Sequence, residues 1–193
     1  MIIQPRIYLA SQSPRRRELL KQIGVNFEML LLRSDPRRSI DVDESPHEGE
    51  HPEDYVRRVS QAKARFGWEG LRLRNLPAFP VLAADTCVTL EGKIIGKPVN
   101  REDAAAMLRQ LSGRQHQVLS AVAVTLDERT EIRVSCSNIT FAPLGEERIM
   151  RYIITNEPLD KALLSDGIAR LVAEVGRLLG GWIKSAEEKR TPA

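Results

Sequence analysis

Apolar residues near the start of the chain follow first a strand pattern and then a helical one. Residues 7–9 are apolar and β-favouring, which predicts a short buried strand. Leucine and isoleucine then recur at helical spacing over 14–23, and Gly24 stands where a left-handed C-terminal cap is expected. Ser13 is a typical N-cap, and Pro14 suits the first helical position. The pattern predicts a strand–turn–helix unit that ends at Gly24.

The rest of the chain alternates between the same two patterns. Further strands are expected at 25–32, 80–90, 93–98, 115–126 and 131–142. Further helices are expected from 52 to about 67, at 101–111, at 144–154 and from 162 to 179. The segments 34–52, 67–79 and 156–161 are expected to be irregular. No internal repeat or low-complexity segment interrupts this order.

Three arginines, Arg15, Arg16 and Arg17, stand at the N-terminus of the first expected helix. The helix dipole is already positive there, so an anion is expected to compensate their charge. Unpaired backbone N–H groups, two serines and fork-shaped guanidinium groups suit a phosphate. The alternative is a solvated helix end whose arginines pair with nearby carboxylates, and the residues leave both interpretations open.

A carboxylate and two lysines are candidates for a second part of such a site. The apolar run 80–84 ends in Asp85, which predicts an acid at the carboxyl edge of a sheet, as a metal ligand or general base. An Asp that caps a turn is the alternative. Lys97, followed by Pro98, is expected on a strand returning towards Asp85, where it would suit phosphate. Lys63 lies near the edge of an apolar helix face, either as filler or pointing into a cleft.

Two further groups have an ordinary explanation beside a functional one. Asp41, Asp43 and Glu44 form an acidic cluster in the long segment 34–52. Long loops are often functional, but plain solvation explains such a cluster equally well. His116 begins an expected strand, without a second His or Cys at metal spacing, so a structural role is expected for it.

The composition is that of an ordinary soluble globular protein, large enough for one domain or two small lobes. The 193 residues are 42% hydrophobic and 28% charged, and the net charge of +3 does not indicate a dedicated nucleic-acid binder. Cys87 and Cys136 lie far apart, which argues against a zinc site and suits a reducing cytosol. No apolar run approaches about 20 residues and no signal peptide is recognised, so a cytoplasmic protein is expected.

Five segments taken together resemble a known family. They read LASQSPRRRELL, then GE followed by EDYVRRVSQAKA, then VLAADTCVTLEGKIIGKP, then MLRQLSGRQHQVLSAVAV, and finally EPLDKA. Their order and spacing over residues 7–162 resemble the Maf family of nucleoside triphosphate pyrophosphatases. Such an ordered set is far more specific than any single motif.

The resemblance implies hydrolysis of a nucleoside triphosphate to the monophosphate and diphosphate, with Mg²⁺ or Mn²⁺ as the divalent cofactor. It also implies an α/β fold related in outline to inosine triphosphatases. That fold is an elongated mixed β-sheet flanked by helices, with a central cleft between two lobes. By the same analogy we expect a nucleotide substrate, no stable nucleic acid partner, no membrane partner, and a homodimer.

Position by position, the resemblance implies roles for eight residues. Asp85 matches the family's proton acceptor. Glu44 matches an acidic residue associated with metal binding and catalysis, so Glu44 and Asp85 are the expected metal ligands. Lys63 and Lys97 match two lysines that contact phosphate and are expected to serve catalysis.

The remaining carried-over positions concern substrate binding. Ser13, Arg15 and Arg16 match the phosphate-contacting loop. Arg15 and Thr86 also match positions tied to base choice, and an arginine directly after Ser13 and Pro14 resembles the dTTP/UTP branch of the family. Pyrimidine triphosphates, modified ones included, are therefore the expected substrates in a nucleotide house-cleaning role.

The match ends at Ala162, and 163–193 are expected to be a divergent C-terminal helix and tail of a single domain, 1–193. A family glutamine that contributes to base recognition is missing. A shifted reading frame or a truncated gene would explain this end, and if the end is genuine, relaxed base specificity is expected. The alternative function is a catalytically impaired nucleotide-binding protein that regulates cell division. A nucleic-acid-binding module would use the arginine cluster, but the chain lacks aromatic stacking surfaces and a basic stripe.

Overall fold

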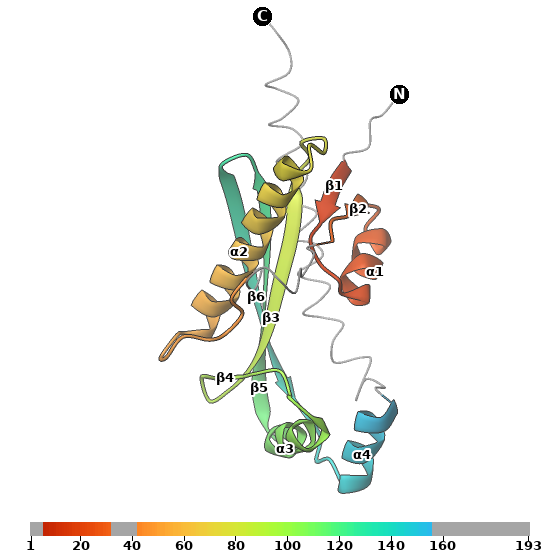
Figure 1. The fold of residues 1–193 in the computed structure, drawn as a ribbon. Coiled ribbons are helices and arrows are strands. Elements are labelled where there is room, and N and C mark those ends of the chain that lie inside the picture. Colours follow the sequence, from red (N-terminus) through yellow and green to blue (C-terminus); the bar gives the residue numbers. More distant parts are fainter. Residues whose placement is uncertain (1–5, 32–41, 156–193) are drawn as a thin grey trace, which may run out of the picture.

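A mixed β-sheet with helices on its faces forms the body of the protein (Figure 1). The computed structural model describes residues 6–31 and 42–155. The strands are β1 (Arg6–Leu9), β2 (Asn26–Met29), β3 (Val81–Leu90), β4 (Lys93–Ile95), β5 (Gln115–Leu126) and β6 (Arg129–Thr140). The helices are α1 (Pro14–Gln22), α2 (Pro52–Leu73), α3 (Arg101–Leu111) and α4 (Glu146–Thr155). Asp41 and the predicted elements from 156 onward lie outside the described residues.

The order of the strands is β2-β1-β3-β5-β6, and β4 pairs with β3 off this path. The pairs β1–β2 and β1–β3 are parallel, whereas β3–β4, β3–β5 and β5–β6 are antiparallel. The α/β fold class with a mixed sheet flanked by helices is thus confirmed.

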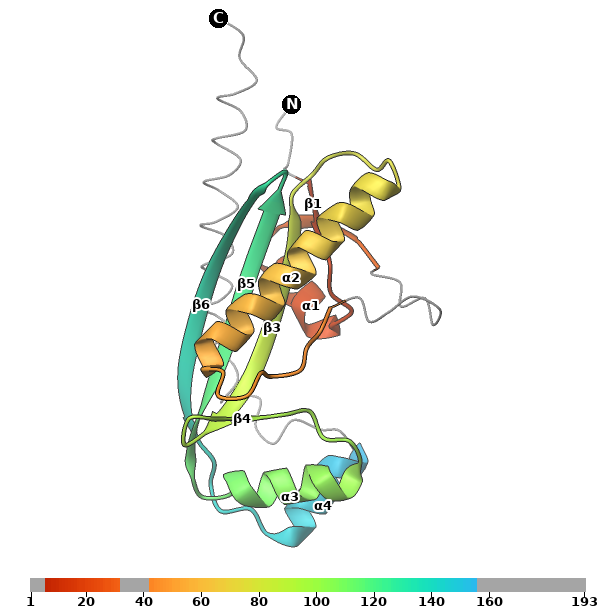
Figure 2. The same ribbon diagram turned by 60° about the vertical axis from the view of Figure 1, so that its left-hand side comes forward.

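The two faces of the sheet are covered by different helices because successive side chains of a strand point to opposite sides. On β3, Leu82 and Ala84 pack in one apolar cluster with Leu20 of α1. Val81 and Ala83 pack in another with Trp68 and other apolar residues of α2. Figure 2 shows α2 crossing β3, β5 and β6 obliquely. The residue parity on β3 therefore decides which helix a side chain meets.

The first predicted unit is confirmed. Helix α1 begins at Pro14, and the Ser13 side chain accepts a hydrogen bond from the Arg16 backbone N–H at 3.5 Å. Gly24 has φ +71°, the left-handed conformation that glycine adopts without a steric cost.

The end predicted for the next helix is wrong, because α2 continues past 67 to Leu73. Its apolar stripe does not stop at Phe66, since Trp68 and Leu71 are buried against the sheet. Gly67 does not end the helix either. A Cβ at Gly67 would lie 2.9 Å from Cγ1 of Val81, so glycine allows the helix to approach the sheet closely.

The later elements agree closely with the predicted ranges: α3 and β5 span 101–111 and 115–126 as expected. Leu90 and Lys93 pair across the expected turn, but β4 ends at Ile95, so Lys97 follows the strand and is not part of it. Helices α3 and α4 share a separate apolar cluster at the open end of the long β5–β6 hairpin, where β5 begins and β6 ends (Figure 1). Within 6–31 and 42–155, no helix combines the length and the apolar character needed to span a bilayer.

Candidate active site

Asp85 lies in the middle of β3 and not at the carboxyl edge of the sheet, which corrects the prediction. The reason is that the strand pattern continues past the acid to Leu90, and Asp85 pairs with Ala121 of β5. The last partner of β1 on β3 is Leu82, whereas β4 begins to pair only at Val88. Among the described strands, none therefore pairs with 83–87 on that side, and Asp85 stands within this gap.

A buried ion pair joins Asp85 to α2. Lys63 Nζ lies 2.8 Å from Oδ1 of Asp85, and the two side chains are only 15% and 7% exposed. Lys63 is therefore not filler on the edge of an apolar face. Asp85 points towards α2 because it shares the parity of Val81 and Ala83 on β3.

Glu44 joins the same group from the segment that precedes α2. Its two carboxylate oxygens lie 2.9 Å from Lys63 Nζ and 2.6 Å from Lys97 Nζ. Partial burial raises the pKa of Glu44, but the hydrogen bonds and charges of Lys97 and Lys63 outweigh it, so the net shift is downward. Glu44 is thus held ionised between two lysines that come from different parts of the chain.

Arg16 brings α1 to these carboxylates. It stands one turn before the buried Leu20 and so shares the sheet-facing side of α1. Burial lowers the pKa of its guanidinium, and the charges of Asp85 and Glu44 act in the opposite direction. Its Nη1 donates a hydrogen bond to Oγ of Ser11 at 3.1 Å. The arginine turn and the acid on β3 are therefore within electrostatic reach of each other.

Two of the predicted site residues lie apart from this group. Arg15 forms an exposed ion pair with Glu18 at 3.1 Å, as in the alternative explanation of the arginine cluster. Thr86 has the opposite parity to Asp85, is exposed, and shares a hydrogen bond of 2.9 Å with Oγ of Ser120. The structure thus joins Asp85 to Lys63, and leaves the roles of Arg15 and Thr86 as predictions.

Sequence analysis missed several residues that support the site. Ser11 accepts a hydrogen bond from the Arg16 guanidinium, and the presence of a second serine in the turn was the sequence feature that could have indicated it. The Tyr55 hydroxyl donates to the backbone carbonyl of Glu44 at 2.9 Å. Burial first, then the charges of Asp85 and Glu44, raise the pKa of Tyr55 to about 12, so the phenol stays a donor. Tyr55 lies in the apolar helical pattern of α2, and this pattern predicted only a core residue.

The two described residues of the acidic cluster, Asp43 and Glu44, have different partners. Asp43 accepts a hydrogen bond of 2.8 Å from the backbone N–H of Ser45, which shapes the local turn. No group of three or more His, Cys, Asp or Glu suited to a metal ion occurs in the part of the chain that the structure describes. His116 is buried against Phe141, with ring centroids 4.6 Å apart, as expected for a structural residue.

A comparison with known protein families finds a match over most of the chain. Residues 6–169 match the family described as Maf-like protein. This chain belongs to the Maf family. The Maf match starts one residue before the range inferred from the motifs and continues seven residues beyond it, into a region outside the described residues.

Curated Maf relatives carry a common name. The chain is 56% identical over 161 residues to the dTTP/UTP pyrophosphatase of Aromatoleum aromaticum, covering 83% of this chain and 78% of that protein. It is 50% identical over 157 residues to the dTTP/UTP pyrophosphatase of Dechloromonas aromatica, covering 81% and 78%. Among solved structures, the Staphylococcus aureus Ham1 protein is similar at a TM-score of 0.45 and 17% identity, over 69% of this chain and 70% of that chain.

Proposed function

We propose that this Maf protein hydrolyses dTTP and UTP, and related pyrimidine triphosphates, to the nucleoside monophosphate and diphosphate. Two relatives at 50% and 56% identity are named dTTP/UTP pyrophosphatases. The observation that carries the proposal is Lys63, which joins the buried Asp85 to Glu44 through contacts of 2.8 and 2.9 Å. It links a carboxylate able to accept a proton with cations able to bind phosphate.

In this proposal the carboxylate of Asp85 takes a proton from the attacking water, while the oxygen of that water forms a bond to the α-phosphorus. The bond from the α-phosphorus to the bridging oxygen then breaks, and diphosphate leaves with the electron pair. Lys63, Lys97 and Arg16 neutralise the charge that develops on the leaving group. Ser13 holds the turn in which Arg16 stands, through the hydrogen bond to its backbone N–H.

Arg15 and Thr86 are proposed to contact the base or the phosphates through their exposed side chains. Arg15 would exchange its surface partner Glu18 for the substrate, which costs little because both side chains are more than half exposed. The hydroxyl of Thr86 is fixed by Ser120 and is accessible from the side of the sheet opposite to Asp85.

The two carboxylates suit the divalent metal that the Maf family implies. Mg²⁺ is usually held by one or two carboxylates together with substrate phosphates and water. Glu44 and Asp85 provide two such ligands within reach of one Lys63 ammonium. We therefore propose Glu44 and Asp85 as ligands of Mg²⁺ or Mn²⁺, which would supply further positive charge beside the phosphates. A single domain over 1–193, a cytoplasmic location and a homodimer remain predictions.

The test is a panel of nucleoside triphosphates with Mg²⁺ or Mn²⁺, in which diphosphate and orthophosphate are measured separately. Wild-type protein is expected to release diphosphate from dTTP and UTP. Asp85→Asn should still bind these nucleotides but lose at least about 100-fold in kcat, the usual share of a general base. Asp127→Asn is the matched control, because it makes the same substitution in an exposed turn whose φ of +54° asparagine accepts.

The other outcomes of this experiment are equally informative. A folded protein that turns over none of the nucleotides would refute the proposal. Thermal stabilisation by dTTP without cleavage would instead favour the alternative function, a nucleotide-binding protein with a regulatory role. Equal losses in Asp85→Asn and Asp127→Asn would remove Asp85 from the reaction.

A further inference from the structure

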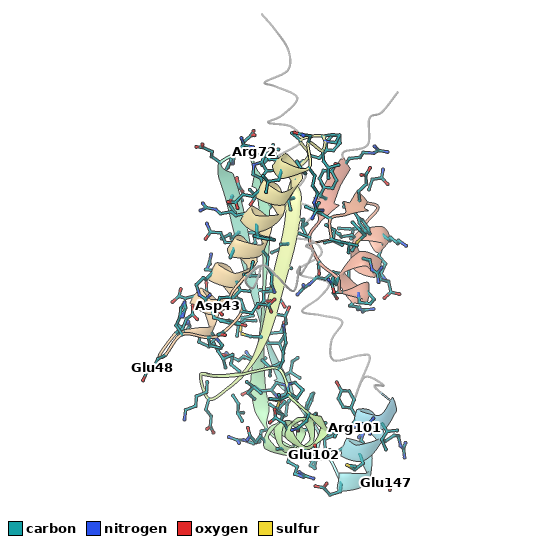
Figure 3. All side chains as sticks on the ribbon, in the orientation of Figure 1. Asp43, Glu48, Arg72, Arg101, Glu102 and Glu147 are labelled. Carbon is teal, nitrogen blue, oxygen red and sulfur yellow. The ribbon has the colours of Figure 1, made fainter. Side chains whose placement is uncertain are left out.

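Side chains of α2 bind three consecutive carbonyl groups in the segment that carries Glu44. Arg58 donates from Nη1 to the carbonyl of Asp43 at 3.2 Å and from Nη2 to that of Ser45 at 2.9 Å. The Tyr55 hydroxyl donates to the carbonyl of Glu44 itself at 2.9 Å. Figure 3 shows Asp43 beside the N-terminal half of α2. The backbone on both sides of Glu44 is therefore attached to the helix.

The Arg58 guanidinium is itself held in one orientation by Glu50. Nε and Nη2 donate to the two carboxylate oxygens of Glu50 at 2.7 and 2.8 Å. The Glu50 side chain is only 9% exposed, and it also accepts from the backbone N–H of His47 at 3.0 Å. This two-point geometry requires the planar fork of an arginine, which a lysine cannot reproduce.

Apart from the contacts of Arg58, Tyr55, Lys63 and Lys97, the hydrogen bonds described for 43–50 are local and shape its turn. Asp43 accepts from Ser45, and the Glu50 backbone N–H donates to the carbonyl of His47 at 3.1 Å. Such bonds shape a turn, but they leave its position relative to the sheet open. Arg58 attaches the backbone on either side of Glu44 to α2, in addition to the single bond from Tyr55, and the Glu44 side chain meets Lys63 at 2.9 Å.

We propose that Arg58, oriented by Glu50, is a positioning residue that sets the Glu44 carboxylate beside Lys63 and Asp85. Arg58 has no contact with the reacting groups in this arrangement and acts through Glu44. The inference rests on the proposed function, because the role of Glu44 in turnover belongs to it. It adds to that function a residue on α2 whose effect on catalysis depends on Glu44.

The test is a double-mutant cycle on diphosphate release from dTTP, with wild type, Arg58→Met, Glu44→Gln and the double variant. Arg58→Met is expected to lower kcat about 100-fold, the effect of a displacement of about 1 Å in a catalytic group. In the Glu44→Gln background the same change should cost less than about 3-fold, because the group that Arg58 positions is already lost. Equal losses in both backgrounds would overturn the proposal.

Two further variants separate positioning from charge and from general stability. Arg58→Lys keeps the charge without the fork, and we expect it to remain at least about 10-fold slower than wild type. Wild-type kcat in Arg58→Lys would overturn the proposal. Arg57→Met is the matched control, because Arg57 is the neighbouring residue and forms an exposed pair with Glu53 on the same helix. Its kcat should not change.

Hydrogen exchange provides a readout that needs no turnover and tolerates variants of reduced stability. Amides within 43–50 should exchange at least about 10-fold faster in Arg58→Met, and also in Glu50→Gln, than in wild type or Arg57→Met. Unchanged exchange in both variants would overturn the proposal. If wild type released no diphosphate, the proposed function would fail, whereas the exchange data would still decide whether Arg58 holds the segment.

Discussion

At the scale of residues, the candidate site brings together two carboxylates and three cations. Asp85 and Glu44 carry two negative charges, and Lys63, Lys97 and Arg16 carry three positive ones. A buried ion pair such as that between Lys63 and Asp85 contributes little net stability, since both charges must lose their water. The excess of one positive charge is instead suited to a polyanion, which brings the negative charge that the cations lack.

The ion pair between Glu50 and Arg58 makes stability depend on pH in the acid range. The hydrogen bonds from Arg58, opposed by burial, lower the pKa of Glu50 from 4.5 to about 2. A lowered pKa contributes stability above pH 4.5, and this contribution is lost as the pH falls towards 2. Urea denaturation of wild type and Glu50→Gln should therefore show a stability difference at pH 6 that shrinks by pH 3. A difference that stays constant over this range would contradict the prediction.

At the scale of elements, α2 combines two tasks along its length. Between its N-terminus and its middle it carries Tyr55, Arg58 and Lys63, which contact Glu44 or the backbone beside it. Its C-terminal half carries Trp68 and Leu71, which are buried against the sheet. Val56 and Val59 in the first half also pack on the sheet, so apolar contacts along the whole helix fix the position of its polar side chains.

Two glycines in α2 offer a test of that packing. A Cβ at Gly67 would lie 2.9 Å from Val81 Cγ1 and 3.2 Å from Ala10 Cβ, whereas one at Gly70 meets nothing within 4 Å. Alanine favours a helix over glycine by about 1 kcal/mol. Gly70→Ala should therefore stabilise the fold by about 0.5–1 kcal/mol, and Gly67→Ala should destabilise it by about 1–3 kcal/mol. Chemical denaturation measures both, and equal effects would show that Gly67 is not closely packed.

Elements with local signals could be predicted from the sequence. Ser13, Pro14 and Gly24 give the limits of α1, and Asn100 caps α3 through a 2.8 Å hydrogen bond to the backbone N–H of Asp103. The end of α2 could not be predicted, because glycine in a helix is unfavourable unless a neighbouring strand requires the space. That strand contains Val81, fourteen residues further along the chain than Gly67.

At the scale of the whole molecule, the described residues contain separate apolar clusters. The sheet clusters lie with α1 and α2, whereas Ala105, Leu108 and Ile149 form a cluster between α3 and α4. Arg109 and Glu146 join the same two helices through contacts of 2.7 and 2.8 Å. In Figure 2, α3 and α4 lie together below the open end of the β5–β6 hairpin, opposite to its turn. These helices thus have a core of their own.

Removing part of that small core should have a local effect. Ile149 is 1% exposed, so Ile149→Ala is expected to cost about 2–5 kcal/mol in the packing of α3 and α4. Amide exchange should accelerate in these helices while α2 and β3 keep their protection. A uniform loss of protection through the described residues would show that the clusters unfold as one unit.

The set of site residues could be inferred from the family resemblance, but their mutual geometry could not. Ordered motifs pointed to Asp85, Lys63 and Glu44, and the structure brings these three together. The role of Arg58 depends on carbonyl groups thirteen and fifteen residues away, and backbone acceptors leave no trace in residue types. Side-chain motifs therefore indicate the candidate site residues, but not the residue proposed to position them.

The opposite parity of Asp85 and Thr86 on one strand limits the shape of a ligand that would touch both. The two side chains lie on opposite faces of the sheet, Asp85 beside Lys63 of α2 and Thr86 exposed beside Ser120, although their backbones are adjacent. A single molecule can contact both side chains only by passing around the edge of β3, in the gap where neither β1 nor β4 pairs with it. A flexible molecule with several rotatable bonds can bend around the strand and contact both faces, whereas a rigid flat ring of similar mass could contact only one face.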